Sequence, residues 1–193
     1  MEFKFKDKEL KKILDNLTII IDSREQANQH IIDFFNKKKH SYVIEKLDFG
    51  DYSCKLPKGS FEGQDRDIYF TRDFVIERKA NIDELCGNLK EDSARLKKEL
   101  AHLNKYNIKY LIYIEDLYFE EHLRNGEFRS QYDPKTLMNR LYKGIECEYD
   151  TVIVPVDKRI MGSKIYNKFQ SWVYALMKHK GFILEGSEGK ELD

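Results

Sequence analysis

The chain has 193 residues, of which 41% are hydrophobic and 13% aromatic, so it suits one folded domain and is not a disordered chain. Its 34 basic and 34 acidic residues cancel, so the net charge points to neither an acidic nor a basic partner. Three cysteines without close spacing argue against a disulfide framework, and a charged N-terminus without an apolar stretch argues against a signal peptide, so we expect a soluble, intracellular protein with no transmembrane helix.

The first part of the chain predicts a helix, a strand, a second helix and a run of strands. A short, frayed helix is expected over residues 10–14, and "LTIIID" (17–22) is a buried strand that ends on an acid. Apolar residues at helical spacing then predict a helix that ends in lysines. The segment 41–56 predicts one or two strands bent at Gly50, and after a glycine-containing loop the segment 67–79 returns as a strand.

The second part alternates helices and strands. Apolar residues between Ile82 and Leu103 keep helical phase and predict one long amphipathic helix. "IKYLIYIED" (108–116) is a buried strand with an acidic end, and Asp133 with Pro134 predicts the start of a helix. "TVIVPV" is the last strand, and a striped helix closes the fold. This order predicts a three-layer α/β fold with a central mixed β-sheet flanked by helices.

The sequence indicates one domain. We expect residues 17–180 to form it, residues 1–16 to be an N-terminal extension with a short helix, and residues 181–193 to be a polar tail. There is no G-x-G-x-x-G after the first strand, no P-loop and no paired-histidine motif. These absences argue against a small-molecule enzyme with a nucleotide-binding loop and against a structural zinc site.

Three strands end on, or bend at, carboxylates. If these strands are neighbours, about 5 Å apart, Asp22, Asp51 and Glu77 can converge within the distance of a shared metal ion. Crowded carboxylates repel each other unless a cation joins them. Mg²⁺ suits a site with few carboxylates and several retained waters. Each acid taken alone is more simply a salt bridge at a strand end, but the set favours a metal site.

Alternation along a strand gives the E-x-K pattern its geometry. Glu77 and Lys79 point to one face, and Arg78 points to the other. Glu77 is then expected to hold the metal, while the Lys79 ammonium orients or helps deprotonate a water and offsets phosphate charge. Arg78 would brace the sheet or pair with an acid such as Asp83. Such a site fits hydrolysis of a phosphodiester bond.

The order "IDSRE … GDY … IERKANIDEL" resembles the nuclease domain of the XPF/MUS structure-specific endonucleases, a branch of the PD-(D/E)XK nucleases. The hallmark of that family is GD(x)n-ERK-x3-D, and the segment "SARLKKELAHL" is similar to the helix that follows it. The motifs cover roughly residues 17–103, and the order of elements extends the resemblance to about residue 177. The matching residues are Asp22, Arg24, Glu25, Gly50, Asp51, Glu77, Arg78, Lys79, Asp83, Arg95 and Glu99.

The resemblance implies a restriction-endonuclease-like fold and a role for each motif residue. The implied metal ligands are Asp22, Asp51 and Glu77, and the implied catalytic residues are Asp51, Glu77 and Lys79. The implied supporting residues are Arg24, Glu25, Arg78 and Asp83, and the implied DNA contacts are Arg24, Arg95 and Lys98. The implied cofactor is Mg²⁺, for which Mn²⁺ substitutes, and the implied substrate is branched or flapped DNA cut by a homodimer during repair, recombination or replication.

Two departures from the family pattern change the expectation. The segment between Asp51 and Glu77 is longer than usual and predicts a hairpin insertion. A helix-hairpin-helix module and a helicase are not expected, which suggests a stand-alone nuclease domain in the cytoplasm or nucleoid of a bacterium, an archaeon or a phage-infected host. Recognition of a branch would then need a separate DNA-targeting protein or a second copy of the chain.

Two alternatives stay open from the sequence. The chain could be a non-catalytic DNA-binding or scaffold subunit of a nuclease complex, although the three residues Asp51, Glu77 and Lys79 are all present. It could also be a resolvase or a sequence-specific nuclease that uses the same core.

Overall fold

The structure is a computed structural model that describes residues 2–90, 93–179 and 182–183. Of the predicted polar tail 181–193, only residues 182–183 lie within the described part of the chain. No helix in the described part has both the length and the apolar character needed to cross a membrane.

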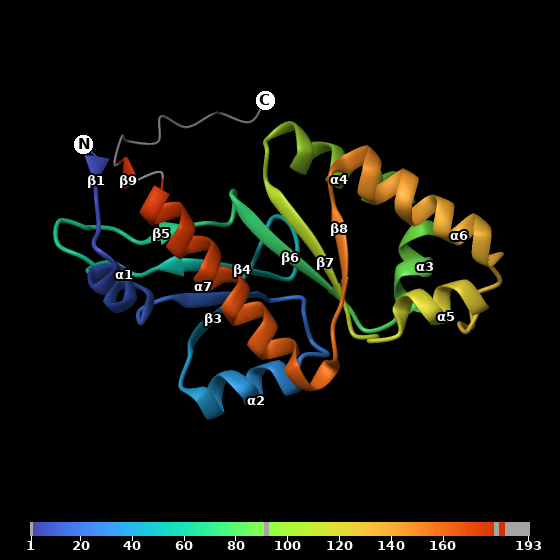
Figure 1. Cartoon of the computed structure of the whole chain (residues 1–193), viewed down its shortest axis with the longest axis horizontal. Helices are drawn as coiled ribbons and strands as arrows, with labels where there is room; N and C mark the ends of the chain where they lie inside the picture. The colour runs from blue at the N-terminus through green and yellow to red at the C-terminus, as the bar shows by residue number, and fades with distance from the viewer. Residues whose placement is uncertain (1, 91–92, 180–181, 184–193) are drawn as a thin grey trace.

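A seven-stranded mixed sheet forms the centre of the molecule (Figure 1). In spatial order the strands are β3 (Ser41–Glu45), β2 (Thr18–Asp22), β4 (Tyr52–Leu56), β6 (Phe74–Lys79), β7 (Lys109–Ile114) and β8 (Val152–Pro155), with β5 (Ile68–Tyr69) paired to β4. Strand β3 runs parallel to β2, and β6, β7 and β8 run parallel to one another, whereas β4 runs antiparallel to both β2 and β6. The predicted three-layer α/β fold is confirmed.

One face of the sheet is covered by helices from the two ends of the chain. These are α1 (Asp7–Leu14), α2 (Gln29–Lys38) and α7 (Met161–His179), which follows the short 3₁₀ turn η2 (Lys158–Ile160). Both α1 and α2 pack against α7, and β1 (Glu2–Phe3) pairs antiparallel with β9 (Phe182–Ile183) beside them. The leading helix is not frayed as expected, because Leu10, Ile13 and Leu14 are buried in this core.

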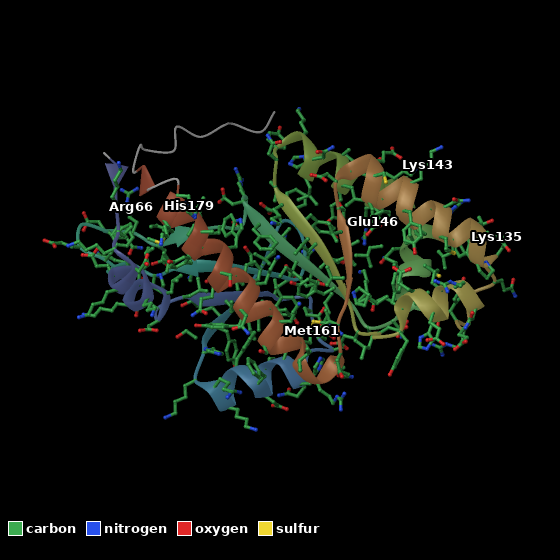
Figure 2. The ribbon with its side chains drawn as sticks, viewed as in Figure 1. Arg66, Lys135, Lys143, Glu146, Met161 and His179 are labelled. Atoms are coloured by element: carbon green, nitrogen blue, oxygen red, sulfur yellow. The ribbon has the colours of Figure 1, made fainter. Side chains whose placement is uncertain are left out.

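The other face of the sheet is covered over β6, β7 and β8 by helices from the middle of the chain (Figure 1). Side chains fill the space between the sheet and the helices on both sides (Figure 2). The helices are α3 (Ile82–Lys90), α4 (Ser93–Lys105), α5 (Phe119–Asn125) and α6 (Pro134–Leu141), which continues as the π-helix η1 (Tyr142–Cys147).

Several element predictions are corrected by the structure. The single helix expected between Ile82 and Leu103 is two helices, α3 and α4, and α5 was not predicted. The segment 41–56 forms two strands that are not neighbours, because β2 lies between β3 and β4. The predicted helix start at Asp133 is confirmed, since its carboxylate accepts a hydrogen bond from the Thr136 amide at 2.9 Å.

Gly50 shapes the entry into β4. Its φ is +67°, and a Cβ at this position would lie 3.1 Å from the Val75 Cβ and 3.2 Å from the Ile76 carbonyl oxygen. Only glycine therefore lets the chain turn here while its backbone touches β6. The turn places Asp51 beside the carboxyl end of β6.

We predict that Gly50→Ala lowers the free energy of unfolding by about 2–4 kcal/mol, because left-handed strain and overpacking add. Gly59→Ala is the matched control, since Gly59 has a φ of +79° but no atom within 4 Å of the added Cβ. The control should lose only about 1 kcal/mol from the backbone strain. Urea denaturation of the two variants measures both losses, and equal losses would contradict the packing argument.

Candidate active site

The register of the sheet brings the three acidic strand ends into one row. Ile21 lies opposite Tyr52, and Tyr52 lies opposite Ile76, so the next residues, Asp22, Asp51 and Glu77, also lie opposite one another. The Asp22 amide donates to the Asp51 carbonyl oxygen at 2.8 Å. Neighbouring residues across antiparallel strands share a face, so the row forms on the face that α3 and α4 partly cover.

Among the described residues, Asp51 and Glu77 are the two carboxylates of this row that lie next to each other without an arginine side chain as partner. Asp51 Oδ2 accepts a hydrogen bond from the backbone amide of Arg78 at 2.7 Å. Burial and the neighbouring Glu77 carboxylate nevertheless raise the pKa of Asp51 to about 8. On α4, burial and Glu77 also raise the pKa of Glu99. The site therefore concentrates carboxylates whose negative charges repel one another.

Asp22 belongs to the row but is already neutralised. Its two oxygens accept hydrogen bonds from the Arg24 guanidinium at 2.7 and 3.0 Å, and Oδ2 also accepts one from the Leu47 amide at 2.6 Å. Burial alone would raise the pKa of Asp22, but these hydrogen bonds outweigh burial and lower it. Asp22 is therefore paired with Arg24 while it lies in the same row as Asp51 and Glu77, and its expected role as a third metal ligand stays a prediction.

Lys79 faces Glu77 on the same side of β6, as the alternation predicts. Lys79 Nζ lies 2.6 Å from Glu77 Oε1 and 3.7 Å from Glu84 Oε1. Burial would lower the pKa of Lys79, but Glu77 outweighs it and raises the pKa. The side chain is therefore an ammonium at neutral pH, which favours the expected electrostatic role over the expected help in deprotonating water.

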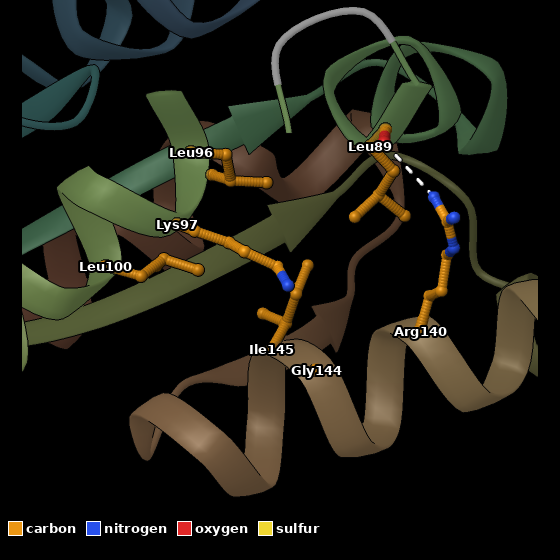
Figure 3. Close-up of a pocket in the computed structure, with 7 residues that line it drawn as sticks. All are labelled: Leu89, Leu96, Lys97, Leu100, Arg140, Gly144 and Ile145. Atoms are coloured by element: carbon orange, nitrogen blue, oxygen red, sulfur yellow. Dashed lines mark hydrogen bonds between the residues drawn. The ribbon is translucent and has the colours of Figure 1, made fainter. Parts of the chain in front are cut away.

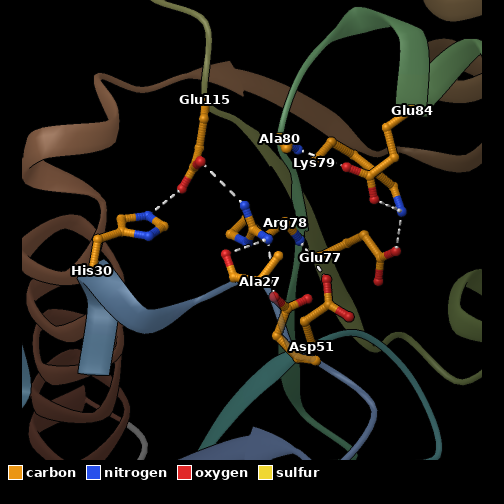
Figure 4. Close-up of polar contacts among 10 residues, drawn as sticks. Ala27, His30, Asp51, Glu77, Arg78, Lys79, Ala80, Glu84 and Glu115 are labelled. Carbon is orange, nitrogen blue, oxygen red and sulfur yellow. Dashed lines mark hydrogen bonds and ion pairs between the residues drawn. The ribbon is translucent and has the colours of Figure 1, made fainter. Parts of the chain in front are cut away.

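Arg78 points to the opposite face, toward α2, and pairs with acids, both as predicted, but Asp83 is not one of them (Figure 4). Its guanidinium lies 2.9 Å from Glu25 Oε1 and 3.1 Å from Glu115 Oε2. Asp83 was expected near this site or paired with Arg78. It instead accepts hydrogen bonds from the amides of Arg129 and Ser130 at 2.8 and 2.9 Å, so it anchors the loop that precedes α6.

Two residues of this network were not predicted from the sequence. Glu115 follows β7 directly and is 2% exposed, and its Oε1 lies 2.5 Å from His30 Nε2 of α2. The one available signal was the acidic end of "IKYLIYIED", which resembles the other acidic strand ends. Nothing in the sequence indicates that His30 lies next to it.

The row opens into a polar cleft of about 450 Å³. Arg24 and Arg95 contribute cations to its walls, in agreement with the expectation that both lie beside the motifs. Lys98 is exposed on α4 and does not line this cleft. The lining residues are Asp22, Arg24, Asp48, Gly50, Asp51, Glu77, Arg95 and Glu99.

A second, smaller pocket of about 170 Å³ lies between α4 and the helix formed by α6 and η1 (Figure 3). Its floor is apolar, and Arg140 at its rim donates to the Leu89 carbonyl oxygen at 3.3 Å. The described residues that line it carry no carboxylate, so it does not share the chemistry of the acid-rich cleft. They are Leu89, Leu96, Lys97, Leu100, Arg140, Gly144 and Ile145.

The pair Asp51 and Glu77 suits a divalent cation. Two opposed carboxylates, one of them with a raised pKa, are stabilised when a cation lies between them. Mg²⁺ commonly binds through one or two carboxylates and keeps several waters. Among the described residues, no group of three or more His, Cys, Asp or Glu side chains is arranged to hold a metal ion. The donor set therefore fits a site of two carboxylates completed by water.

Comparisons with known proteins agree with the fold and with the motifs. The model of the ERCC4 domain family matches residues 21–165, which include the whole acidic row. XPF from Aeropyrum pernix has a similar structure, with a TM-score of 0.57 and 13% sequence identity over 84% of this chain and 68% of that chain. At this identity the likeness concerns the fold alone. No curated protein matches the chain.

We predict that Asp51→Asn raises the melting temperature of the metal-free protein at pH 8. The folded-state pKa of Asp51 is about 8 against 3.8 for the free side chain, so stability falls as pH rises through this window. Because asparagine does not titrate, the variant lacks this pH dependence, and its gain in melting temperature over the wild type should vanish near pH 3.8. Thermal unfolding in EDTA across this pH range measures it.

Asp22→Asn is the matched control for that experiment, and it should have the opposite sign. The pKa of Asp22 is lowered by Arg24, so its carboxylate stabilises the fold above the unfolded-state value of 3.8 and loses this effect as pH falls. The variant should therefore melt at a lower temperature than the wild type at neutral pH. A lower melting temperature for Asp51→Asn at pH 8 would contradict the repulsion between Asp51 and Glu77.

We also predict that Asp83→Ala affects stability and not metal binding. The variant loses the two amide hydrogen bonds from Arg129 and Ser130, which should cost about 1–3 kcal/mol. The ion pair with Arg129 adds little, because that arginine is 88% exposed. Urea denaturation gives the loss, and calorimetric titration with Mn²⁺ should give the wild-type affinity. Weaker Mn²⁺ binding by Asp83→Ala would show that Asp83 contributes to the metal site.

Proposed function

The chain belongs to the ERCC4 domain family and shares the fold of XPF, and we propose that it is an XPF-type, metal-dependent endonuclease that hydrolyses phosphodiester bonds in branched DNA. The observation that carries this proposal is the opposed pair Asp51 and Glu77 with the Lys79 ammonium 2.6 Å from Glu77. Two carboxylates and one cation at a strand end are the groups that phosphodiester hydrolysis needs.

Asp51 and Glu77 would hold the divalent cation, Mg²⁺ or Mn²⁺ in its place. When bound, the cation supplies charge stabilisation for a phosphate oxygen and lowers the pKa of a bound water. The Arg78 amide holds one Asp51 oxygen at 2.7 Å, and Asp51 lines the cleft in which the cation would lie. Asp22 lines the same cleft and would be the third carboxylate ligand, and in this arrangement its carboxylate is paired with Arg24.

Lys79 would contribute as a fixed positive charge. Its pKa is raised, so it stays protonated and can donate hydrogen bonds to a water or to a phosphate oxygen. Its long side chain is only 11% exposed and is held by Glu77 and Glu84, so the ammonium needs little reorganisation during the reaction.

The walls of the cleft suit a polyanionic substrate. Arg24, which follows β2, and Arg95, on α4, both line the cleft and can contact phosphates next to the cleavage position. Such contacts make affinity fall with salt concentration. Lys98 lies on the same helix as Arg95 and would extend the contact along the DNA.

The alternatives differ in what they require from the site. A non-catalytic scaffold subunit has no need for a repulsive pair of acids, and keeping Asp51 with a raised pKa disfavours that reading. A resolvase or a sequence-specific nuclease could use the same acids. The choice among these substrates rests on the family, in which branched DNA is the implied substrate.

The assembly and setting are part of the proposal. We propose a homodimer formed through the nuclease domain, with a second copy or a separate DNA-targeting protein that grips the other arm of the branch. Repair, recombination or replication inside a bacterial, archaeal or phage-infected cell would supply such DNA. Light scattering on the purified chain tests the dimer, and a monomeric mass at micromolar concentration would contradict it.

The cleavage assay decides the reaction. The chain is incubated with end-labelled flap, fork, four-way junction and linear duplex DNA, with Mg²⁺, with Mn²⁺ or with EDTA. We expect cleavage of the branched substrates with either metal and none with EDTA. Asp51→Asn, Glu77→Gln and Lys79→Ala should each lower kcat by about a hundredfold or more, because each removes a charge on which the transition state depends.

Asp83→Ala is the control variant, and it should cut at the wild-type rate below its own melting temperature. If no DNA is cleaved with either metal, the proposed enzymatic activity is contradicted and the non-catalytic scaffold subunit is favoured. Equal cleavage of linear and branched DNA would contradict structure specificity. Full activity of Asp51→Asn would show that the metal site lies elsewhere.

A further inference from the structure

Behind the acidic row, a buried ionic network crosses the other face of the sheet (Figure 4). Arg78 is 4% exposed and lies between two carboxylates, Glu25 at 2.9 Å and Glu115 at 3.1 Å. It also donates to the Ala27 carbonyl oxygen at 3.1 Å. Glu115 has a second partner, His30, at 2.5 Å. The metal and the DNA would both lie on the opposite face, so none of these side chains can touch them.

The network joins the loop after β2, strand β6 and the end of β7, and two of these strands, β2 and β6, carry residues of the acidic row. Glu25 and Ala27 belong to the loop that follows β2, and Glu115 follows β7. Arg78 belongs to β6, and its backbone amide is the group that donates to Asp51 Oδ2. One residue therefore links the network on one face to a site carboxylate on the other, through its own side chain and backbone.

Glu115 is the member on which this link most depends. Its side chain is 2% exposed, and each of its two oxygens has a partner: one lies next to the Arg78 guanidinium and the other next to His30. Within the described part of the chain, Nε of Arg78 has no hydrogen-bond partner. Besides the Ala27 carbonyl oxygen, the guanidinium has only the two carboxylates among the described residues to balance its charge, and loss of one would leave a buried charge half paired.

We propose that Glu115 is a positioning residue of the active site, which fixes the Arg78 backbone, and through it the Asp51 carboxylate, from the opposite face of the sheet. The inference rests on the proposed function for its catalytic consequence, although its geometric part does not. A network kept only for stability could be replaced by apolar residues at little cost. Through its link to the Asp51 carboxylate the network would also orient an active-site residue, and this role can be tested separately from stability.

Glu115→Gln keeps the shape of the side chain and removes its charge. Its matched control is Asp116→Asn, the same chemical change at the next residue. Asp116 also faces a histidine, His122 at 2.8 Å, but it makes no contact with Arg78. We measure three quantities for both variants: the exchange rate of the Arg78 amide proton by NMR, the Mn²⁺ dissociation constant by calorimetry, and kcat and KM on flap DNA.

For Glu115→Gln we expect faster exchange of the Arg78 amide, an Mn²⁺ dissociation constant raised about tenfold, and a kcat lowered about tenfold to a hundredfold, the usual effects of losing a group that orients metal ligands. KM for DNA should stay unchanged, because the DNA contacts lie on the other face. Asp116→Asn should leave all three quantities at the wild-type values.

Unchanged Arg78 exchange in Glu115→Gln overturns the proposal, and so do equal effects in the two variants. If the wild type cuts no DNA, the proposed function fails, but the exchange rate and the Mn²⁺ affinity still decide the role of Glu115. If Glu115→Gln does not fold, His30→Gln replaces it. That variant keeps the Glu115–Arg78 pair and should show smaller changes in the same direction, and unchanged Arg78 exchange would again overturn the proposal.

Discussion

The site depends on the antiparallel insertion of β4 between β2 and β6. Because β4 runs antiparallel, its first residue lies beside the last residues of β2 and β6, and Asp51 is therefore in line with Asp22 and Glu77. If β4 ran parallel to them, its first residue, and Asp51 with it, would lie at the opposite end of the strands. Gly50 makes the insertion possible, because its left-handed turn lets the backbone lie directly against β6.

Charge divides the row into two functional parts. Asp22 receives the Arg24 guanidinium and two backbone amides, so its charge is satisfied within the protein. Asp51 receives one amide and faces Glu77, so its charge is left for an external cation. The fold therefore bears a local electrostatic cost at the proposed metal site, which a bound cation would offset. Lys79 reduces this cost for Glu77 without neutralising Asp51.

The sequence was sufficient for features that depend on local periodicity. Strand alternation predicted that Glu77 and Lys79 share a face and that Arg78 does not, and the spacing of motifs predicted the family and the fold. The partners of the charged groups could not be predicted, because they come from distant segments. Asp83 meets Arg129 from 46 residues away, and Arg78 meets Glu25 from 53 residues away. Pairing at such distances follows from packing of the whole sheet, which no local pattern records.

The two faces of β6 show why the three charged residues stand together. Adjacent residues on a strand point to opposite faces but share a rigid backbone, so a contact made by Arg78 on one face limits the positions open to Glu77 and Lys79 on the other. Three charges in succession would be costly in a strand with one solvated face, because the middle one must be buried. Here the buried charge has two carboxylate partners. The E-R-K run is therefore one unit in which the outer residues lie on the face of the acidic row and the middle residue is anchored on the opposite face.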